Sequence, residues 1–511
     1  MRHFILSLAA LPTALVLLLI LLLLQSRGFG QIHERDFNAG KGIPSQKVSI
    51  QDHTSTAGTG SDSGHALIST AASAPAPTDT VKPKPIAFPA EELDAFFDHL
   101  HRHNKFMGSV AVLSGGEMVY QHSAGFADVS QEVPNNDRTR HHIGSVTKTF
   151  TATLILQLAE EQKLHLDQPL SDFFDGFPAG DQISLNELLY HRSGLFSFTN
   201  DPEYTSWMTE PRSREELVEL MRSYDQHFEP DSRMEYSNTN YVLLGYIIED
   251  VTGMSYQQAL KTRITGPLDL EDTYYAKIIS IDRNESYSYS FSDGWEKLPE
   301  TDMSIPHGAG ALVSTPTDMV RFGRTLFKGK LLKPASLEIM THLRDSFGMG
   351  LISYTYHGKT GFGHTGGIDG FQSNLAMYPD DDLYVAVAAN ALSWSNNGLL
   401  VALMDAWHGK PVELPDFDTA DLSPEQLQSL AGTYASGQIP LEIRFWEDGG
   451  LLMAQATGQG AFPMEAASET RFRFDPAGLV IEFHADEEEK YRRFTLYQAG
   501  MEFLFERKQD K

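Results

Sequence analysis

Ser145 and Lys148 are the first side chains whose types and spacing could do chemistry. They form the only S-x-x-K tetrapeptide of the chain, Ser145-Val146-Thr147-Lys148. Residues three apart share a helix face, so Lys148 would stand one turn above Ser145, near a helix N-terminus that suits an oxyanion. A lysine in an apolar interior has a lowered pKa and can act as a base toward a serine hydroxyl. About one such tetrapeptide is expected by chance in a chain this long, so alone it indicates a nucleophile only weakly.

A second set of polar side chains, Tyr236-Ser237-Asn238, is the only Y-x-N motif of the chain. It directly precedes an apolar stretch over 242–251 that predicts a helix. A tyrosine near a cationic lysine can act as general base or acid, and Asn238 can donate to a substrate carbonyl while accepting from Lys148. Taken alone, the motif is explained equally well as a capping loop before a helix.

A third motif, His364-Thr365-Gly366-Gly367, lies in a strand-like segment that holds further glycines. Glycines allow a substrate to lie against a strand edge, and the Gly367 N–H could act as an oxyanion donor beside that of Ser145. The structural alternative is a glycine-rich turn with a surface histidine.

The elements that must position these motifs follow from the hydrophobic pattern. The stretch 147–164 is helical and, as far as Leu158, apolar on all sides, which is typical of a helix buried in a large core. Strands are predicted at 108–113 and 118–122 and return at 361–378 and 383–390, with a helix at 397–407. We therefore expect an α+β domain in which early and late strands share one sheet.

Composition excludes several classes of protein. The 511 residues include 40 Lys and Arg, 68 Asp and Glu and no cysteine, which gives a net charge of −28. Without cysteine there are no disulfides, thiolate metal sites or cysteine nucleophiles. The negative charge argues against nucleic acid as a partner.

The N-terminal region predicts export. Phe4–Leu24 is uncharged and apolar over 21 residues, about the length that spans a bilayer, and Arg2 before it favours a cytoplasmic N-terminus. The run is longer than the usual signal-peptide core of about 7–15 residues, so we expect a membrane anchor at 1–30, with a cleaved signal peptide as the alternative. Either way the remainder is extracytoplasmic. Residues 31–87 are rich in Ser, Thr, Gly and Pro, which predicts a flexible tether.

The C-terminal region differs in composition from the rest. Residues 410–424 are acidic and contain proline, which indicates a linker. Residues 425–511 alternate short apolar runs with turns, the pattern of a small antiparallel barrel or sandwich. The main domain is then expected at 88–409.

Together the three motifs resemble, in order and spacing, the serine β-lactamase and penicillin-binding superfamily. The most similar branch is that of the class C β-lactamases with their D-alanyl-D-alanine carboxypeptidase, D-aminopeptidase and esterase relatives. The resemblance covers about 88–409, and 425–511 resembles more weakly the lipocalin-like appendage of some members. Further matching segments are Gly125-Phe126-Ala127-Asp128, Leu188–Leu195, Leu244–Glu249, Gly266–Leu270 and Gly310–Thr315.

This resemblance implies an antiparallel sheet flanked by helices, with a helical subdomain. It implies that Ser145 is the acylating nucleophile and that Lys148 and Tyr236 transfer its proton. Asn238 would position the substrate amide, and the N–H groups of Ser145 and Gly367 would form the oxyanion hole. His364, Thr365, Gly366 and Gly367 would line the site of a small-molecule or peptide substrate. The reaction would need neither metal nor cofactor.

One departure from the family pattern affects the expected activity. Penicillin-recognising members usually have lysine where this chain has His364, and a histidine is largely neutral near pH 7. Hydrolysis of an ester, amide or peptide bond is therefore favoured over β-lactamase activity. Two alternatives stay open: a catalytically weak penicillin- or peptidoglycan-binding scaffold tethered to a membrane, and a regulator whose C-terminal module occupies its own active site. The oligomeric state is not predicted.

Histidines outside these motifs are expected to have structural roles. His101 and His103, and likewise His141 and His142, match neither H-E-x-x-H nor a comparable metal motif, so we expect solvated pairs and no metal. His191 lies in the H-x-S-G-L segment and is expected to be buried and hydrogen-bonded.

Overall fold

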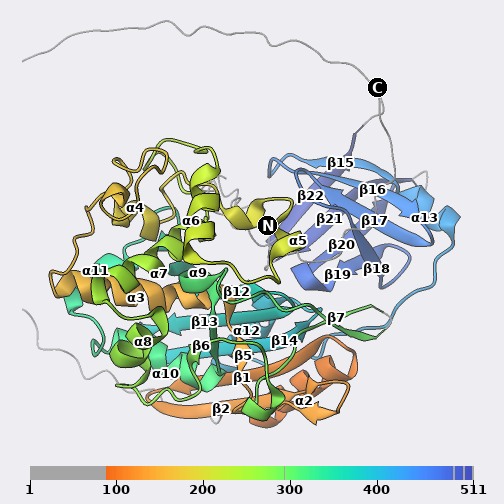
Figure 1. Cartoon of the computed structure of the whole chain (residues 1–511). Coiled ribbons are helices and arrows are strands. Elements are labelled where there is room, and N and C mark those ends of the chain that lie inside the picture. The colour runs from red at the N-terminus through yellow and green to blue at the C-terminus, as the bar shows by residue number, and fades with distance from the viewer. Residues whose placement is uncertain (1–87, 293, 487–489, 499–500, 509–511) are drawn as a thin grey trace, which may run out of the picture. The chain divides into compact units, whose positions relative to one another are not determined.

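The computed structural model describes residues 88–292, 294–486, 490–498 and 501–508 (Figure 1). The anchor or signal peptide expected at 1–30 and the tether at 31–87 lie outside these residues. Within the described ranges, no helix has both the length and the apolar character needed to cross a bilayer. The domain boundaries expected at 409 and 424 stay predictions.

Seven antiparallel strands form the main sheet, in the order β10-β11-β12-β13-β14-β1-β2. The first strand of the domain, β1, lies between β2 and the last strand, β14. It pairs with β14 from Phe106 opposite Leu392 to Ser114 opposite Leu383. This confirms the expectation that early and late strands share one sheet. The bounds are β1 (Phe106–Ser114), β2 (Glu117–Ala124), β10 (Phe347–Gly348), β11 (Leu351–Tyr356), β12 (Lys359–Ile368), β13 (Phe371–Tyr378) and β14 (Leu383–Leu392).

Both faces of this sheet are buried, as the alternation of side chains along β1 shows. Val110 and Val112 join a core with α2 (Ala90–Arg102) and α12 (Asn396–Trp407). Ala111 and Leu113 join the larger core of the helical region on the opposite face. All ten residues of β14 are buried, and its one amide side chain, Asn390, donates to the Phe126 and Tyr287 carbonyls.

The helical region is built around α3 (Thr147–Glu160), whose residues Thr147–Leu156 are all buried. The predicted helix ends four residues earlier than expected, because Gln162 takes a left-handed conformation (φ +57°) in the turn that follows. Figure 1 shows α4, α6 and α7 gathered with α3 on one side of the sheet. The bounds are α4 (Leu185–Leu189), α5 (Tyr204–Trp207), α6 (Arg214–Ser223), α7 (Asn238–Thr252), α8 (Tyr256–Leu260), α9 (His307–Gly310), α10 (Pro316–Phe327) and α11 (Pro334–Thr341).

Three small antiparallel sheets join the remaining segments. One contains His141 and His142, which were expected to be solvated. That expectation is wrong: both are buried, with His141 bonded to the Ser286 hydroxyl, and burial lowers their pKa values to about 3 and about 4. The bounds are β3 (Phe126–Asp128), β4 (Val133–Pro134), β5 (His141–His142), β6 (Tyr274–Tyr275), β7 (Tyr289–Phe291), β8 (Trp295–Lys297) and β9 (Leu312–Ser314).

The C-terminal region forms a closed antiparallel barrel of eight strands, β15 to β22, preceded by α13 (Pro424–Leu430). Alternating residues such as Ile443 and Phe445, and Ile481 and Phe483, fill its interior. The α+β fold followed by a small all-β unit is thus confirmed, and that unit is a barrel. The bounds are β15 (Gly432–Ser436), β16 (Glu442–Asp448), β17 (Leu451–Ala456), β18 (Phe462–Ala466), β19 (Arg471–Phe474), β20 (Leu479–Ala485), β21 (Tyr491–Gln498) and β22 (Met501–Arg507).

The packing of α2 on the sheet can be tested with Phe97→Ala. Phe97 is fully buried, and its ring lies 5.2 Å from that of Phe106 in β1. We expect unfolding to become easier by about 3–5 kcal/mol in chemical denaturation followed by circular dichroism. Ile278→Ala is the control, because Ile278 is 81% exposed and should change stability by only about 0.5 kcal/mol. Equal effects of the two substitutions would contradict this packing.

Candidate active site

Ser145 lies in a single turn of 3₁₀ helix, η2 (Gly144–Val146), that leads directly into α3. The turn is held from two sides: the Ile143 N–H donates to the Leu312 carbonyl (2.9 Å), and the Ile143 carbonyl accepts from the Ser373 hydroxyl (2.8 Å). Ser145 is partly exposed, while its neighbours Gly144 and Val146 are buried. The fold therefore presents one hydroxyl at the N-terminus of a buried helix.

Lys148 is fully buried one turn further along the chain. Its Nζ donates to Ser145 Oγ (2.9 Å), Asn238 Oδ1 (2.7 Å) and the Ala309 carbonyl (2.7 Å). No carboxylate pairs with Lys148 among the described residues. Burial lowers the pKa of Lys148 well below its usual value. The amine is therefore in direct contact with the serine, and its burial favours the neutral form that can accept a proton.

Tyr236 lies close to the amine of Lys148. The Lys148 Nζ lies 4.9 Å from the centre of the Tyr236 ring. Burial raises the pKa of Tyr236 above its usual value, and the nearby Ser145 hydroxyl lowers it by less. The tyrosine is thus a neutral phenol in this structure and can donate a proton.

Asn238 is the first residue of α7, and its amide is fixed at both ends. Its Oδ1 accepts from Lys148, and its Nδ2 donates to the Thr199 hydroxyl (2.9 Å). Its backbone N–H donates to the Ser197 hydroxyl (3.0 Å). The predicted contact with Lys148 is present, while the donor end of the amide is bonded to Thr199.

The third motif lies on β12, beside the turn that carries Ser145. A Cβ added to Gly144 would lie 2.8 Å from Gly367 N, and one added to Gly366 would lie 2.0 Å from the Ile143 carbonyl oxygen. Only glycines allow the two backbones to approach this closely. Gly367 itself is exposed, with open space where its side chain would be.

His364 is buried on the same strand, with Nδ1–H donating to the Thr365 carbonyl (2.6 Å). Burial, with a smaller contribution from nearby Lys148, lowers the pKa of His364 to about 3. Its ring lies 6.0 Å from that of Tyr236. The position that holds a fixed cation in penicillin-recognising relatives is therefore neutral here.

Contacts that the sequence motifs did not reveal complete the site. His191 packs its ring on Tyr236 at 4.2 Å, and its Nδ1 accepts from the Ser237 N–H (3.1 Å). It is buried and hydrogen-bonded, as its segment predicted. Thr199 and the Ala309 carbonyl were missed, since an isolated threonine and a backbone oxygen leave no pattern in the sequence.

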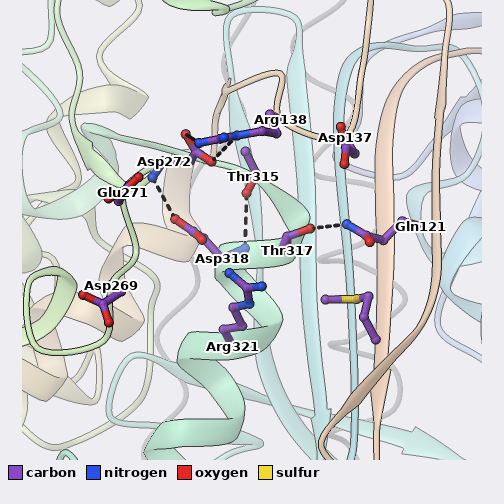
Figure 2. Close-up of a pocket in the computed structure, with 11 residues that line it drawn as sticks. Gln121, Asp137, Arg138, Asp269, Glu271, Asp272, Thr315, Thr317, Asp318 and Arg321 are labelled. Carbon is purple, nitrogen blue, oxygen red and sulfur yellow. Dashed lines mark hydrogen bonds and ion pairs between the residues drawn. The ribbon is translucent and has the colours of Figure 1, made fainter.

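A pocket at the N-terminal end of α10 includes none of the predicted site residues (Figure 2). Two of its carboxylates have partners inside the pocket: Asp272 pairs with Arg138 (3.4 Å), and Asp318 accepts from the Asp272 N–H (3.1 Å). In the described part of the chain, no group of three or more His, Asp or Glu residues is arranged to hold a metal ion.

The beta-lactamase family model matches residues 93–403. This chain belongs to the beta-lactamase family. Penicillin-binding protein 4* of Bacillus subtilis strain 168 is 26% identical over 453 residues, which are 81% of this chain and 97% of that protein. Teichoic acid D-alanine hydrolase of Staphylococcus aureus is 28% identical over 296 residues, 57% of this chain and 72% of that protein. The structure of D-amino acid amidase from Ochrobactrum anthropi SV3 complexed with D-phenylalanine has a TM-score of 0.56 and 27% identity, covering 62% of this chain and 98% of the amidase.

The close approach of η2 and β12 predicts that Gly144→Ala slows labelling of Ser145 by a fluorophosphonate about 10-fold or more. An added methyl group would push Gly367 away from the serine turn. Gly115→Ala is the matched control: both glycines have positive φ (+46° and +60°), so both alanines carry the same strain of about 1–2 kcal/mol, but Gly115 has open space around it. Equal labelling rates in the two variants would contradict the role of this contact.

Proposed function

We propose that this chain is a serine hydrolase that cleaves an ester or amide bond through an acyl-enzyme on Ser145. The observation that supports this most strongly is the contact between the Ser145 hydroxyl and a fully buried lysine that has no carboxylate partner in the described residues. A lysine in that setting is a base rather than a structural cation.

Acylation would begin with neutral Lys148 accepting the proton of Ser145. The Oγ electron pair forms a bond to the substrate carbonyl carbon, and the carbonyl electrons move to its oxygen. The N–H groups of Ser145 and Gly367 would bind that oxyanion, which is worth about 2.7–4 kcal/mol per donor in other hydrolases.

Collapse of this intermediate would need a proton donor for the leaving group. Tyr236 is a neutral phenol and would give its proton to the leaving oxygen or nitrogen, while Lys148 returns the serine proton to the tyrosine. The acyl carbon keeps its bond to Ser145, and the bond to the leaving group breaks with its electron pair. In deacylation, water would give a proton to the same pair and bond to the acyl carbon. The bond from that carbon to Ser145 Oγ then breaks, and Oγ takes the proton back.

The neutral state of His364 supports substrates whose leaving group carries no carboxylate. β-Lactams and carboxypeptidase substrates have a carboxylate that a fixed cation would bind, and His364 provides none. Similarity to a teichoic acid D-alanine hydrolase and to a D-amino acid amidase supports the same choice. We therefore propose a D-aminoacyl ester or amide as the substrate class.

A catalytically weak penicillin-binding scaffold is the second candidate, supported by the similarity to penicillin-binding protein 4* over almost the full length of that protein. The bond between Ser145 and Lys148, with the Tyr236 ring 4.9 Å from the lysine amine, favours the hydrolase. We further propose that the chain acts outside the cytoplasm, anchored through the apolar run Phe4–Leu24.

The assignment of the nucleophile predicts that a fluorophosphonate labels the wild type and not Ser145→Ala. Ser223→Ala is the control: it removes an exposed hydroxyl at the end of α6, outside the predicted site, and should label like the wild type. Labelling that persists in Ser145→Ala would refute the assignment. Strong labelling by a fluorescent penicillin without turnover of esters or amides would instead support the scaffold.

The assignment of the base predicts that Lys148→Ala lowers the acylation rate about 10³-fold or more, because the residues of such a unit act together. Lys148→Arg should lose as much, since a guanidinium keeps the charge but does not deprotonate. Lys163→Ala, at an exposed lysine, is the control. Rates can be measured by stopped-flow acylation, and near-normal acylation in Lys148→Ala would leave Tyr236 as the base.

A further inference from the structure

We propose that Asp369 binds the ammonium group of an aminoacyl substrate. It would then be the residue that selects acyl groups whose amino group is unblocked. The proposal rests on the serine hydrolase function proposed above. It concerns a carboxylate that the reaction steps do not use, two residues beyond the oxyanion donor Gly367 on the same strand hairpin.

The direction of the substrate along β12 follows from the proton transfers. Tyr236 gives its proton to the leaving group, and the ring of His364 lies 6.0 Å from that of Tyr236. The leaving group therefore lies toward the His364 end of the strand. With the carbonyl oxygen at Gly367, the acyl substituent must extend the other way, toward Ile368 and Asp369.

The edge of β12 is open over this stretch. β11 pairs with β12 only from Lys359 to Gly363, and in the described residues no other strand pairs with that edge from His364 to Ile368. Two residues of strand span about 7 Å. An α-ammonium group lies one carbon beyond the acyl carbonyl, so the side chain of Asp369 can reach it.

Asp369 is held in place by its turn and by one neighbour. Ile368 pairs with Phe371, which makes Asp369-Gly370 a two-residue hairpin loop, and Asp369 takes the left-handed conformation (φ +52°) that such loops need. Its carboxylate accepts from the Thr301 hydroxyl (2.6 Å) and from the Thr301 N–H (3.2 Å). Thr301 is buried, so the carboxylate has a fixed orientation.

The charge of Asp369 is not balanced by the protein. No Lys, Arg or His pairs with it within the described ranges, and the nearest charge that acts on it is that of Glu300. The partly buried carboxylate of Asp382, by contrast, pairs with Arg324 and Lys328. Burial raises the pKa of Asp369 to about 6, so it is mostly ionised at neutral pH. A partly buried anion without a counter-ion is suited to a cationic ligand.

The loop that holds Asn238 also reaches Asp369. Thr199 accepts from Asn238. Tyr204, five residues later, has its pKa raised by burial and, to a smaller extent, by the nearby carboxylate of Asp369. The Tyr204 ring packs against Trp207 at 5.1 Å. These aromatic side chains would exclude water from the ammonium–carboxylate pair and strengthen it.

The test compares two substrates that differ only at the amino group: D-alanine methyl ester, with a free ammonium, and N-acetyl-D-alanine methyl ester, in which that group is an uncharged amide. We expect the wild type to prefer the first, and Asp369→Asn to lower its kcat/KM about 10- to 100-fold while changing that of the acetylated ester and of p-nitrophenyl acetate about 2-fold or less. Asp369→Gly should behave in the same way, because asparagine and glycine both suit the left-handed conformation of this turn. Asp381→Asn is the control, since Asp381 lies in another hairpin of the same sheet, paired with Lys359.

Equal losses on the charged and the acetylated ester would overturn the proposal, as would a wild type that hydrolyses the two esters equally fast. Calorimetric binding of D-alaninamide to Ser145→Ala, with and without Asp369→Asn, separates this proposal from the proposed hydrolase. Binding that weakens about 10-fold or more with Asp369→Asn supports the ammonium site. If the wild type hydrolyses none of the three esters, that absence of hydrolysis contradicts only the hydrolase. Unchanged binding overturns the site.

Discussion

The hydrogen bonds of buried Lys148 are the interaction on which the rest of the site depends. Its amine is taken out of water, with three oxygen acceptors around it and no carboxylate partner in the described residues. Burial without a counter-ion penalises the charged form, while the three acceptors keep the amine in one position. A group that is both fixed and easily deprotonated is what a serine hydroxyl needs as a base.

Those three acceptors come from distant parts of the chain, so the fold must bring them together. Ser145 belongs to η2, Asn238 begins α7, and the Ala309 carbonyl lies in α9. The Thr151 hydroxyl donates to the neighbouring Gly308 carbonyl (2.6 Å), which ties α9 to α3. The sheet contributes β12 to the site, and the glycines of this strand let a backbone N–H approach the serine turn. Displacement of any of these elements would alter the proton path.

Much of this arrangement could be predicted from the sequence. Strands such as β1 were found to within two residues, because burial on both faces gives a nearly continuous apolar run that the sequence displays. The pairing of the first strands with the last followed from their order along an α+β chain. Ser145, Lys148 and Asn238 were chosen from short motifs, and the structure places all three in contact.

Other features could not be predicted, for identifiable reasons. The Ala309 carbonyl and the Thr199 hydroxyl act through tertiary contacts that no local pattern encodes. The burial of His141 and His142 was missed because their strand is only two residues long and takes its cover from distant segments. Asp369 was not singled out, because an Asp-Gly pair is a common hairpin signal. Only the structure reveals that Thr301 orients its carboxylate and that no cation in the described residues balances it.

The central claim is that Lys148 is neutral at the pH at which the protein would act. The most direct measurement is an NMR titration of the protein with ¹³C-labelled lysine, with the Lys148 signal assigned by its loss in Lys148→Arg. The account predicts that this signal titrates well below the ordinary lysine value of 10.5. Titration of Lys148 at or above 10.5 would contradict it, because the amine would then be a permanent cation that cannot accept the serine proton.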